Sequence, residues 1–246
     1  MNRRKSVFQT SFAAMLIGAT AYGQASAPVT AADVIEGMVR SEKEQEKNLP
    51  LYRTIREYRL ANGDGTKAVQ VIAGVGFDAK SGKTITVLQE SGAEGIFRRV
   101  IRKVLEAEER ASRNDGDEMR LSPANYDFKL MGSETRDGRL CHVLQLLPKK
   151  KSKFLIDGKI WVDAQEYALV RLEGRPAASL SFWVGKPLIT QSFQRVGNGM
   201  WLMSRNESST NAKLFGRVTF TMELKEVQAG GTKLAVSRPP NKSRAD

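Results

Sequence analysis

Residues 213–225, Lys-Leu-Phe-Gly-Arg-Val-Thr-Phe-Thr-Met-Glu-Leu-Lys, carry the most regular pattern in the 246-residue chain. The apolar side chains alternate with polar or charged ones and share one side, namely Leu214, Val218, Phe220, Met222 and Leu224. Because residues two apart point to the same face of a strand, this pattern predicts a strand with one buried face, as in an antiparallel sheet. Gly216 interrupts the apolar series and indicates a bulge or a sharp bend.

The same one-sided pattern recurs through most of the chain before this stretch. It predicts strands at 52–60, 68–77, 84–89, 126–131, 140–147, 154–162, 167–173, 180–184, 188–196 and 200–205. Turn signals such as Asn-Gly-Asp-Gly at 62–65 and Asp-Gly at 137–138 separate several of them. We therefore expect an α+β, mostly β fold, a long antiparallel meander of about ten strands that must curl because open sheets of this size do.

Two segments have the helical period instead. Thr30 and Asp33 form an N-cap pattern, followed by apolar residues on one helical face at Val34, Ile35, Met38 and Val39. A second helix is expected over 93–112, with its apolar face at Ile96, Val100, Val104 and Leu105 and its basic side at Arg98, Arg99, Arg102 and Lys103. Both helices are expected to lie in the concave face of the sheet, leaving an apolar space that is a natural ligand cavity.

The first 27 residues have the three parts of a secretory signal peptide. Arg3, Arg4 and Lys5 precede an apolar stretch at 12–21, and small residues at 21–23 and 25–27 suit a signal peptidase. The apolar stretch is about ten residues, where a spanning helix needs about 20. We expect a signal peptide at 1–25, a single domain at 28–227, a disordered tail at 228–246, and a periplasmic or secreted mature protein.

Charge and cysteine content agree with export. The formal charge of +12 is +9 without the three basic residues of the predicted signal peptide. Outside the cytoplasm such a charge favours lipid head groups or anionic glycans over nucleic acid, or it serves solubility alone. The basic run at 149–153 is either a contact with head groups or a solvated turn. Cys141 is the one cysteine of the chain, so no intramolecular disulfide can form and no cysteine near the cleavage region can carry a lipid.

No catalytic or metal centre is expected. Cys141 and His142 are neighbours on a predicted strand, so their side chains point to opposite faces and cannot form a nucleophile–base pair. With one histidine in the chain, a histidine-rich metal site is excluded. Asp163 and Glu166 bracket a turn, where acidic residues are ordinary. We expect a non-enzymatic protein without a cofactor.

The chain from 126 to 224 as a whole resembles a known family. The stretches that carry the resemblance are Tyr-Asp-Phe at 126–128, Gly-Arg-Leu-Cys-His-Val at 138–143, Gly-Lys-Ile-Trp-Val-Asp at 158–163, Tyr167, Arg171, Trp-Leu at 201–202 and Leu-Phe-Gly at 214–216. They are similar to the outer-membrane lipoprotein-sorting (LolA/LolB-like) periplasmic proteins, of which this chain resembles a divergent member. The resemblance implies an open half-barrel covered by helices, with an interior that holds the acyl chains of lipids or lipoproteins.

Two functions remain open at this point. The first is a carrier in outer-membrane lipoprotein sorting, binding lipid or lipoprotein acyl chains through inward-facing Tyr126, Phe128, Leu130, Ile160, Val162, Val170, Leu172, Val218, Phe220 and Met222. The second is a periplasmic sensor or adaptor of envelope homeostasis. It would bind an envelope membrane protein through the basic side of the second helix or the basic run at 149–153.

Overall fold

The computed structural model describes residues 28–48, 51–78, 82–111, 118–180, 185–197, 199–213 and 216–236. The predicted signal peptide, nearly all of the strand predicted at 180–184 and the chain after residue 236 lie outside them. The elements are α1 (Ala31–Asn48), β1 (Tyr52–Asn62), β2 (Ala68–Asp78), β3 (Gly82–Gly92), α2 (Ile96–Ala111), β4 (Tyr126–Arg136), β5 (Arg139–Pro148), β6 (Ile156–Asp163), β7 (Leu169–Pro176), β8 (Leu188–Val196), β9 (Met200–Ala212), β10 (Gly216–Ala229) and β11 (Thr232–Leu234).

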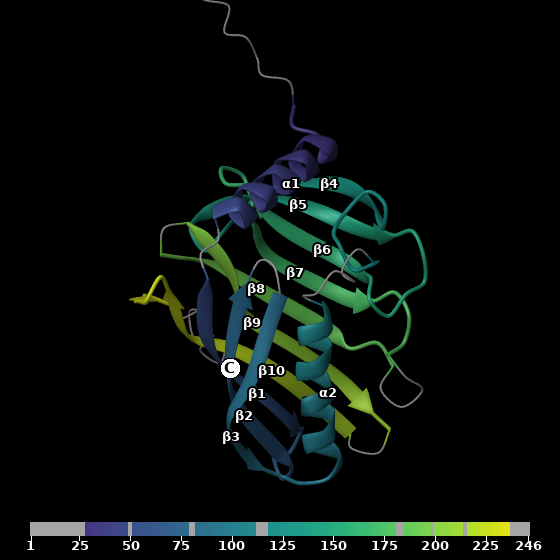
Figure 1. The fold of residues 1–246 in the computed structure, drawn as a ribbon. Coiled ribbons are helices and arrows are strands. Elements are labelled where there is room, and N and C mark those ends of the chain that lie inside the picture. Colours follow the sequence, from purple (N-terminus) through teal and green to yellow (C-terminus); the bar gives the residue numbers. More distant parts are fainter. Residues whose placement is uncertain are drawn as a thin grey trace, which may run out of the picture.

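All the strands belong to one antiparallel sheet with the order β3-β2-β1-β10-β9-β8-β7-β6-β5-β4, and β11 pairs with β10. The expected open, curled sheet of about ten strands is therefore confirmed, but the expectation of a plain meander is wrong. The chain leaves the edge strand β3, passes through α2 and re-enters at the opposite edge as β4 (Figure 1). The sheet is made continuous in its middle, where β1 pairs with β10 over 11 residue pairs from Tyr52↔Ala229 to Asn62↔Val218.

Two glycines face each other where β6 pairs with β7. Gly158 and Gly174 are opposite in the register, and a Cβ on either residue would overlap the backbone of the other strand. Only glycine permits this contact, because every other residue would push the strands apart. Both strands belong to the part of the curled sheet that lies below α1 (Figure 1).

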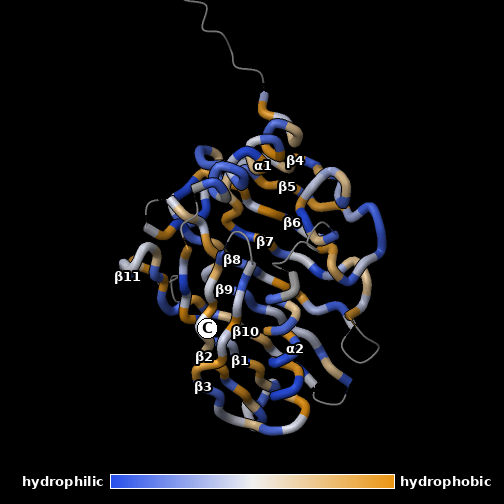
Figure 2. Tube along the Cα trace, viewed as in Figure 1, coloured by the Kyte–Doolittle hydropathy of each residue, from blue (hydrophilic) through white to orange (hydrophobic). Residues whose placement is uncertain are grey.

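Both helices lie on the inner face, and α1 begins as predicted. Thr30 and Asp33 exchange capping hydrogen bonds of 2.7–3.2 Å, and Val34 and Ile35 are buried against the sheet. Within the residues that the structure describes, neither helix has the length and apolar content of a membrane span. Figure 2 shows hydrophobic and hydrophilic residues alternating along the strands, as an antiparallel sheet with one covered face requires.

The apolar face predicted for α2 is right at Leu105, which is buried, but wrong at Ile96 and Val100, which are 49% and 39% exposed. The other buried positions are Phe97 and Ile101. Both sets are apolar and spaced four residues apart, so the pattern could not distinguish the buried set from its neighbour. The helix is therefore apolar over a wider arc than its contact with the sheet needs.

Residues 228–236, which the sequence predicted to belong to a disordered tail, are ordered in the structure. β10 continues to Ala229, and a two-residue turn leads into β11, which pairs through Val227↔Leu234 and Ala229↔Thr232. Leu234 and Val236 pack against a buried cluster that includes Val196 and Val227. Residues 228–236 are thus part of the folded domain.

Candidate ligand-binding face

The strand register places inner-face residues in rows that cross the whole sheet. One row is apolar at both ends and polar in its middle, and it consists of Leu130, Leu144, Ile160, Leu172, Gln191, Asn206, Met222, Tyr58 and Val71. The next row repeats this order with Phe128, Leu146, Gly158, Gly174, Ile189, Ser208, Phe220, Leu60 and Val69. The inner face therefore has two apolar ends separated by a more polar centre.

Each helix covers one apolar end. Under α1, Val34 and Ile35 pack into a cluster with Tyr126, Leu144, Leu146, Leu155, Ile160, Val162 and Leu172. Under α2, Phe97, Ile101 and Leu105 pack into a cluster with Tyr58, Leu60, Val69, Val71, Ala73 and Met222. The interior is filled by side chains at both ends, so the apolar residues there contribute to the stability of the fold whatever else they do.

Nine of the ten predicted ligand residues lie on the inner face. Tyr126, Ile160, Val162 and Leu172 are buried in the α1 cluster, with Phe128 and Leu130 packed against it. Met222 is buried in the α2 cluster, with Val218 and Phe220 half-buried beside it.

The tenth residue, Val170, is on the outer face, so its placement with the others was wrong. The register passes from Trp161↔Arg171 to Val162↔Leu169, which leaves Val170 as the extra residue of a bulge. It packs with Cys141, Val143 and Trp161 on the far side of the sheet, while Leu169 takes the inward position instead.

Between the two covered ends lies a part of the inner face that we call the inter-helix face. It consists of the half-buried residues Ile189, Gln191, Asn206, Ser208, Val218 and Phe220. These residues come from β8, β9 and β10. The three strands lie in the middle of the sheet, between the part that α1 covers and the part that α2 covers (Figure 1). Large apolar side chains are therefore left partly accessible in the middle of the inner face.

The exposed apolar side of α2 is turned away from the edge strand β3. Arg98 and Arg102 pair with Glu90 of β3 at 2.9 Å each, so this side of the helix is turned toward the sheet edge. Ile96, Val100 and Val104 lie on the opposite side of the helix from these arginines, because residues are spaced 100° apart around the axis. That side is partly open to solvent, since Ile96 is 49% and Val100 39% exposed.

A buried ionic cluster holds α2 to the sheet. Glu108 pairs with Arg56 of β1 and with Lys83 of β3 at 3.0 Å, and the Tyr58 hydroxyl donates a hydrogen bond of 3.0 Å to it. The side chain of Arg56 is 4% exposed. Burial raises the pKa of Glu108, but Lys83 and Arg56 outweigh it and keep that pKa below its usual value. Burial, and then the negative charge of Glu108, raises the pKa of Tyr58.

The polar residues that the sequence analysis considered for chemistry are divided between the two faces of the sheet. Cys141 is buried beside Trp161, whereas His142 lies 3.0 Å from the Ser133 hydroxyl and next to Tyr167, so thiol and imidazole are on opposite faces as predicted. Asp163 and Glu166 both accept hydrogen bonds from Arg139, at 2.6 and 2.7 Å. Burial raises the pKa of Asp163, but Arg139 and the main-chain N–H groups of Glu166 and Gln165 lower it overall. A charge-paired carboxylate of this kind stabilises a turn and is not a free acid or base.

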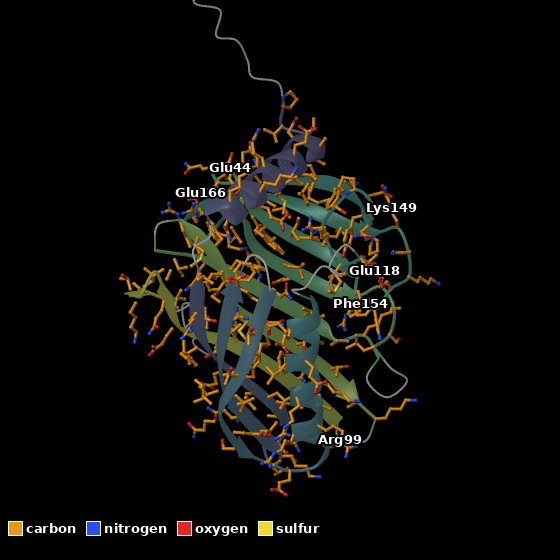
Figure 3. All side chains as sticks on the ribbon, in the orientation of Figure 1. Glu44, Arg99, Glu118, Lys149, Phe154 and Glu166 are labelled. Carbon is orange, nitrogen blue, oxygen red and sulfur yellow. The ribbon has the colours of Figure 1, made fainter. Side chains whose placement is uncertain are left out.

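A pocket of about 880 Å³ lies where α1 meets one end of the sheet. Its walls come from α1, the β6–β7 turn, the β8–β9 turn and the start of β11, and they include Tyr167 and Trp201. Glu44 and Glu166 also line it (both labelled in Figure 3). Glu166 is already bound to Arg139, Arg195 and the indole N–H of Trp201. This pocket does not coincide with the apolar cavity expected between the helices and the sheet.

Sequence reasoning missed the ionic cluster and the polar centre of the inner face. Arg56 and Glu108 are 52 residues apart in the sequence, so the pattern around either residue gives no sign of the other. The polar centre had a visible signal, because the inward positions of β9 at 206, 208 and 210 are Asn, Ser and Thr. Recognising them required the β9–β10 register, which the pattern of one strand does not supply.

The fold and this face define a class of protein, an open antiparallel sheet whose inner face is partly covered by two helices. A family model described as "Family of unknown function (DUF5686)" matches residues 120–228. No curated protein matches the chain.

Solved structures with this architecture include three low-identity matches. A domain described as an outer membrane lipoprotein-sorting protein, from Vibrio parahaemolyticus, is 11% identical over 78% of this chain and 91% of its own, with a TM-score of 0.45. A LolA superfamily protein from Nitrosomonas europaea is 14% identical over 82% and 94%, with a TM-score of 0.44. A DUF1329 family protein from Desulfovibrio piger is 15% identical over 82% and 94%, with a TM-score of 0.43.

Proposed function

We propose that this protein is a non-enzymatic carrier that holds acyl chains against the inter-helix face. One observation supports the proposal above the others: apolar side chains of α2 and of the middle strands are left partly exposed on the side of the sheet where the helices lie. Ile96 and Val100 contribute from the helix, and Val218, Phe220 and Ile189 from the sheet. Monomeric proteins rarely leave apolar side chains grouped in this way unless they bind something.

Binding of this kind needs no catalytic group or cofactor, since burial of each methylene group contributes about 0.8 kcal/mol. A chain lying between α2 and β10 would cover Ile96, Val100 and Phe220 together. In this proposal the mature protein acts in the periplasm or outside the cell after removal of the signal peptide predicted at 1–25. The cargo is a lipid or the acyl chains of a lipoprotein on its way to the outer membrane.

The test is native mass spectrometry, with organic extraction, of the protein purified from a periplasmic fraction. We expect a co-purifying acyl compound that disappears in Phe220→Glu, because a carboxylate on the inter-helix face opposes an apolar chain. Thr219→Glu is the matched control, since Thr219 is the next residue of β10 and points to the outer face. Folded protein that binds no acyl compound, either as purified or after lipid is added, would contradict the proposal.

A sensor or adaptor that binds a protein segment is the second candidate. It is favoured by the outward surface of α2, where Arg99, Arg102 and Lys103 are exposed (Figure 3 labels Arg99). Arg102 is partly engaged with Glu90, which leaves Arg99 and Lys103 as the better contacts for an acidic partner. Recovery of one defined envelope protein by the native chain, lost in Arg99→Glu/Lys103→Glu, together with an empty inter-helix face, would support this function over the carrier.

A further inference from the structure

The centre of the inner face has a run of polar side chains on β9. Asn206, Ser208 and Thr210 occupy three successive inward positions, opposite Met222, Phe220 and Val218 of β10. On the other side, Asn206 faces Gln191 and Ser208 faces Ile189 of β8. The polar run is therefore bordered by apolar side chains on the same face, rather than forming part of a wholly polar surface.

One atom of this run is covered and lacks a partner. The side-chain oxygen Oδ1 of Asn206 is buried and has no hydrogen bond. A buried acceptor without a donor is unfavourable, and folded proteins pair the large majority of such atoms. A ligand lying on the inter-helix face, next to the partly exposed apolar residues, is one source of the missing donor.

The chemistry of this face restricts what that ligand can be. None of its six residues is basic, so a carboxylate or phosphate would find no opposite charge among them. An ester linkage is neutral but carries only acceptors, which cannot satisfy the Asn206 oxygen. An amide linkage is neutral, has an N–H for Asn206, and has a carbonyl oxygen that the hydroxyl of Ser208 can reach as a donor.

We infer that the inter-helix face selects acyl chains joined through an amide, with the amide N–H donating to Asn206 and the chain lying on the apolar residues beside it. This inference rests on the proposed carrier function and adds the linkage chemistry of the cargo. Amide-linked acyl groups occur in lipids and in acylated polypeptides, and the N–H is the feature that both would present.

The test compares two ligands that differ in one atom position, N-methyl lauramide and methyl laurate, as displacers of the neutral dye 1-N-phenylnaphthylamine from the native protein. We expect the amide to displace the dye at a concentration about fivefold to tenfold lower than the ester, the effect of one net hydrogen bond. Asn206→Leu should bind the dye and reduce this ratio to about one. Ser209→Val, on the outer face of the same strand, should leave the ratio unchanged.

The outcomes separate this inference from the function on which it rests. Equal displacement by amide and ester in native protein that binds the dye would overturn the amide preference and leave the carrier function intact. A folded native protein that binds neither the dye nor either ligand would overturn both. The comparison of ligands on the native chain decides the matter even if Asn206→Leu does not fold.

Discussion

The two helices cover the same face of the sheet, but they are held there by different forces. α1 is held by shape and neutral hydrogen bonds. Gly37 lies against the ring of Tyr167 so closely that a Cβ would overlap it, and the side-chain amide of Gln45 bonds to both the N–H and the C=O of Trp201 at 3.2 and 3.1 Å. α2 is held by three apolar side chains and by the charge of Glu108 against Arg56 and Lys83.

This difference indicates which helix is easier to displace. Close packing is lost over a short distance, because a gap of about 0.5–1 Å already forfeits a quarter to a half of the contact energy. A buried ion pair is different, since its net contribution is small when intact but its loss leaves an uncompensated charge. We therefore expect α2 to be the helix whose position responds to its surroundings and α1 to be the fixed one.

The largest expected effect comes from removing the charge that holds α2. Glu108→Ala leaves Arg56 buried without its partner, which should lower the free energy of unfolding by roughly 3 kcal/mol. Denaturant unfolding measures this change, and hydrogen exchange should place the loss of protection in α2. The control is Glu106→Ala, at an exposed position two residues earlier in the same helix. It should change the free energy of unfolding by less than about 0.5 kcal/mol. Similar losses of protection in both helices would contradict the comparison.

A second variant tests the shape of the α1 contact. Gly37→Val places side-chain atoms where the Tyr167 ring lies, and overpacking of this kind should cost about 2 kcal/mol. Hydrogen exchange should become faster in α1 and stay unchanged in α2. The double variant Gly37→Val/Tyr167→Ala should recover part of the loss, because the obstructing ring is gone. Failure of the second change to recover anything would mean that Gly37 acts through helix propensity and not through this contact.

Acidification should release α2 before the C-terminal half of α1. The pKa of Glu108 is lowered in the folded state, so its stabilising effect is present above the unfolded pKa of about 4.5 and is lost as pH falls through the lower folded value. Hydrogen exchange at pH 6, 4.5 and 3, corrected for intrinsic rates, should show protection of α2 falling across this interval. The contacts of Gly37 and Gln45 contain no carboxylate. The carboxylate of Asp33 at the start of α1 does take up a proton in acid, and this weakens only the N-cap. Parallel loss in both helices would contradict a charge-dependent attachment of α2 alone.

The smallest expected effect is at Gln45. Gln45→Ala removes two hydrogen bonds to the main chain of Trp201, for a loss of about 1 kcal/mol. The exposed residue Lys43 offers the matched control Lys43→Ala, for which no change is expected. Thermal unfolding at neutral pH measures the loss of stability in each variant. The loss in Gln45→Ala should not depend on salt concentration, because both hydrogen-bonding partners are uncharged. A salt-dependent loss would mean that Gln45 acts through nearby charges.

Local patterns predicted the strands well, because alternation within one strand depends only on which face is covered. The strand at 188–196 has the predicted ends, and the capping pattern of Thr30 and Asp33 marks the true start of α1. Properties that depend on two strands at once could not be predicted in this way. The bulge that turns Val170 outward arises from the β6–β7 register, and the choice between Phe97 and Ile96 on α2 depends on how the helix rests on the sheet.

The residues of the candidate site also divide into those that one segment predicts and those that depend on contacts between segments. The inward positions of Phe220 and Met222 were readable from the alternation of a single segment. The importance of Asn206 and Glu108 was not, because a polar residue in a strand or a helix looks ordinary until its neighbours from distant segments are known. Residues that break an apolar surface are thus the ones for which the structure adds most.

The pairing of β1 with β10 also has a consequence for how the chain acquires its fold. While the polypeptide is being made or exported, the hairpins of the first three strands and the strands from β4 to β9 can each form from residues near in sequence. Each part then ends in an unpaired edge, at β1 and at β9, until residues 216–229 arrive to join them. Because β10 completes the sheet, a chain truncated before it would expose two unpaired strand edges that can aggregate. In the full chain, we expect folding to end in a slow step that joins two parts already formed.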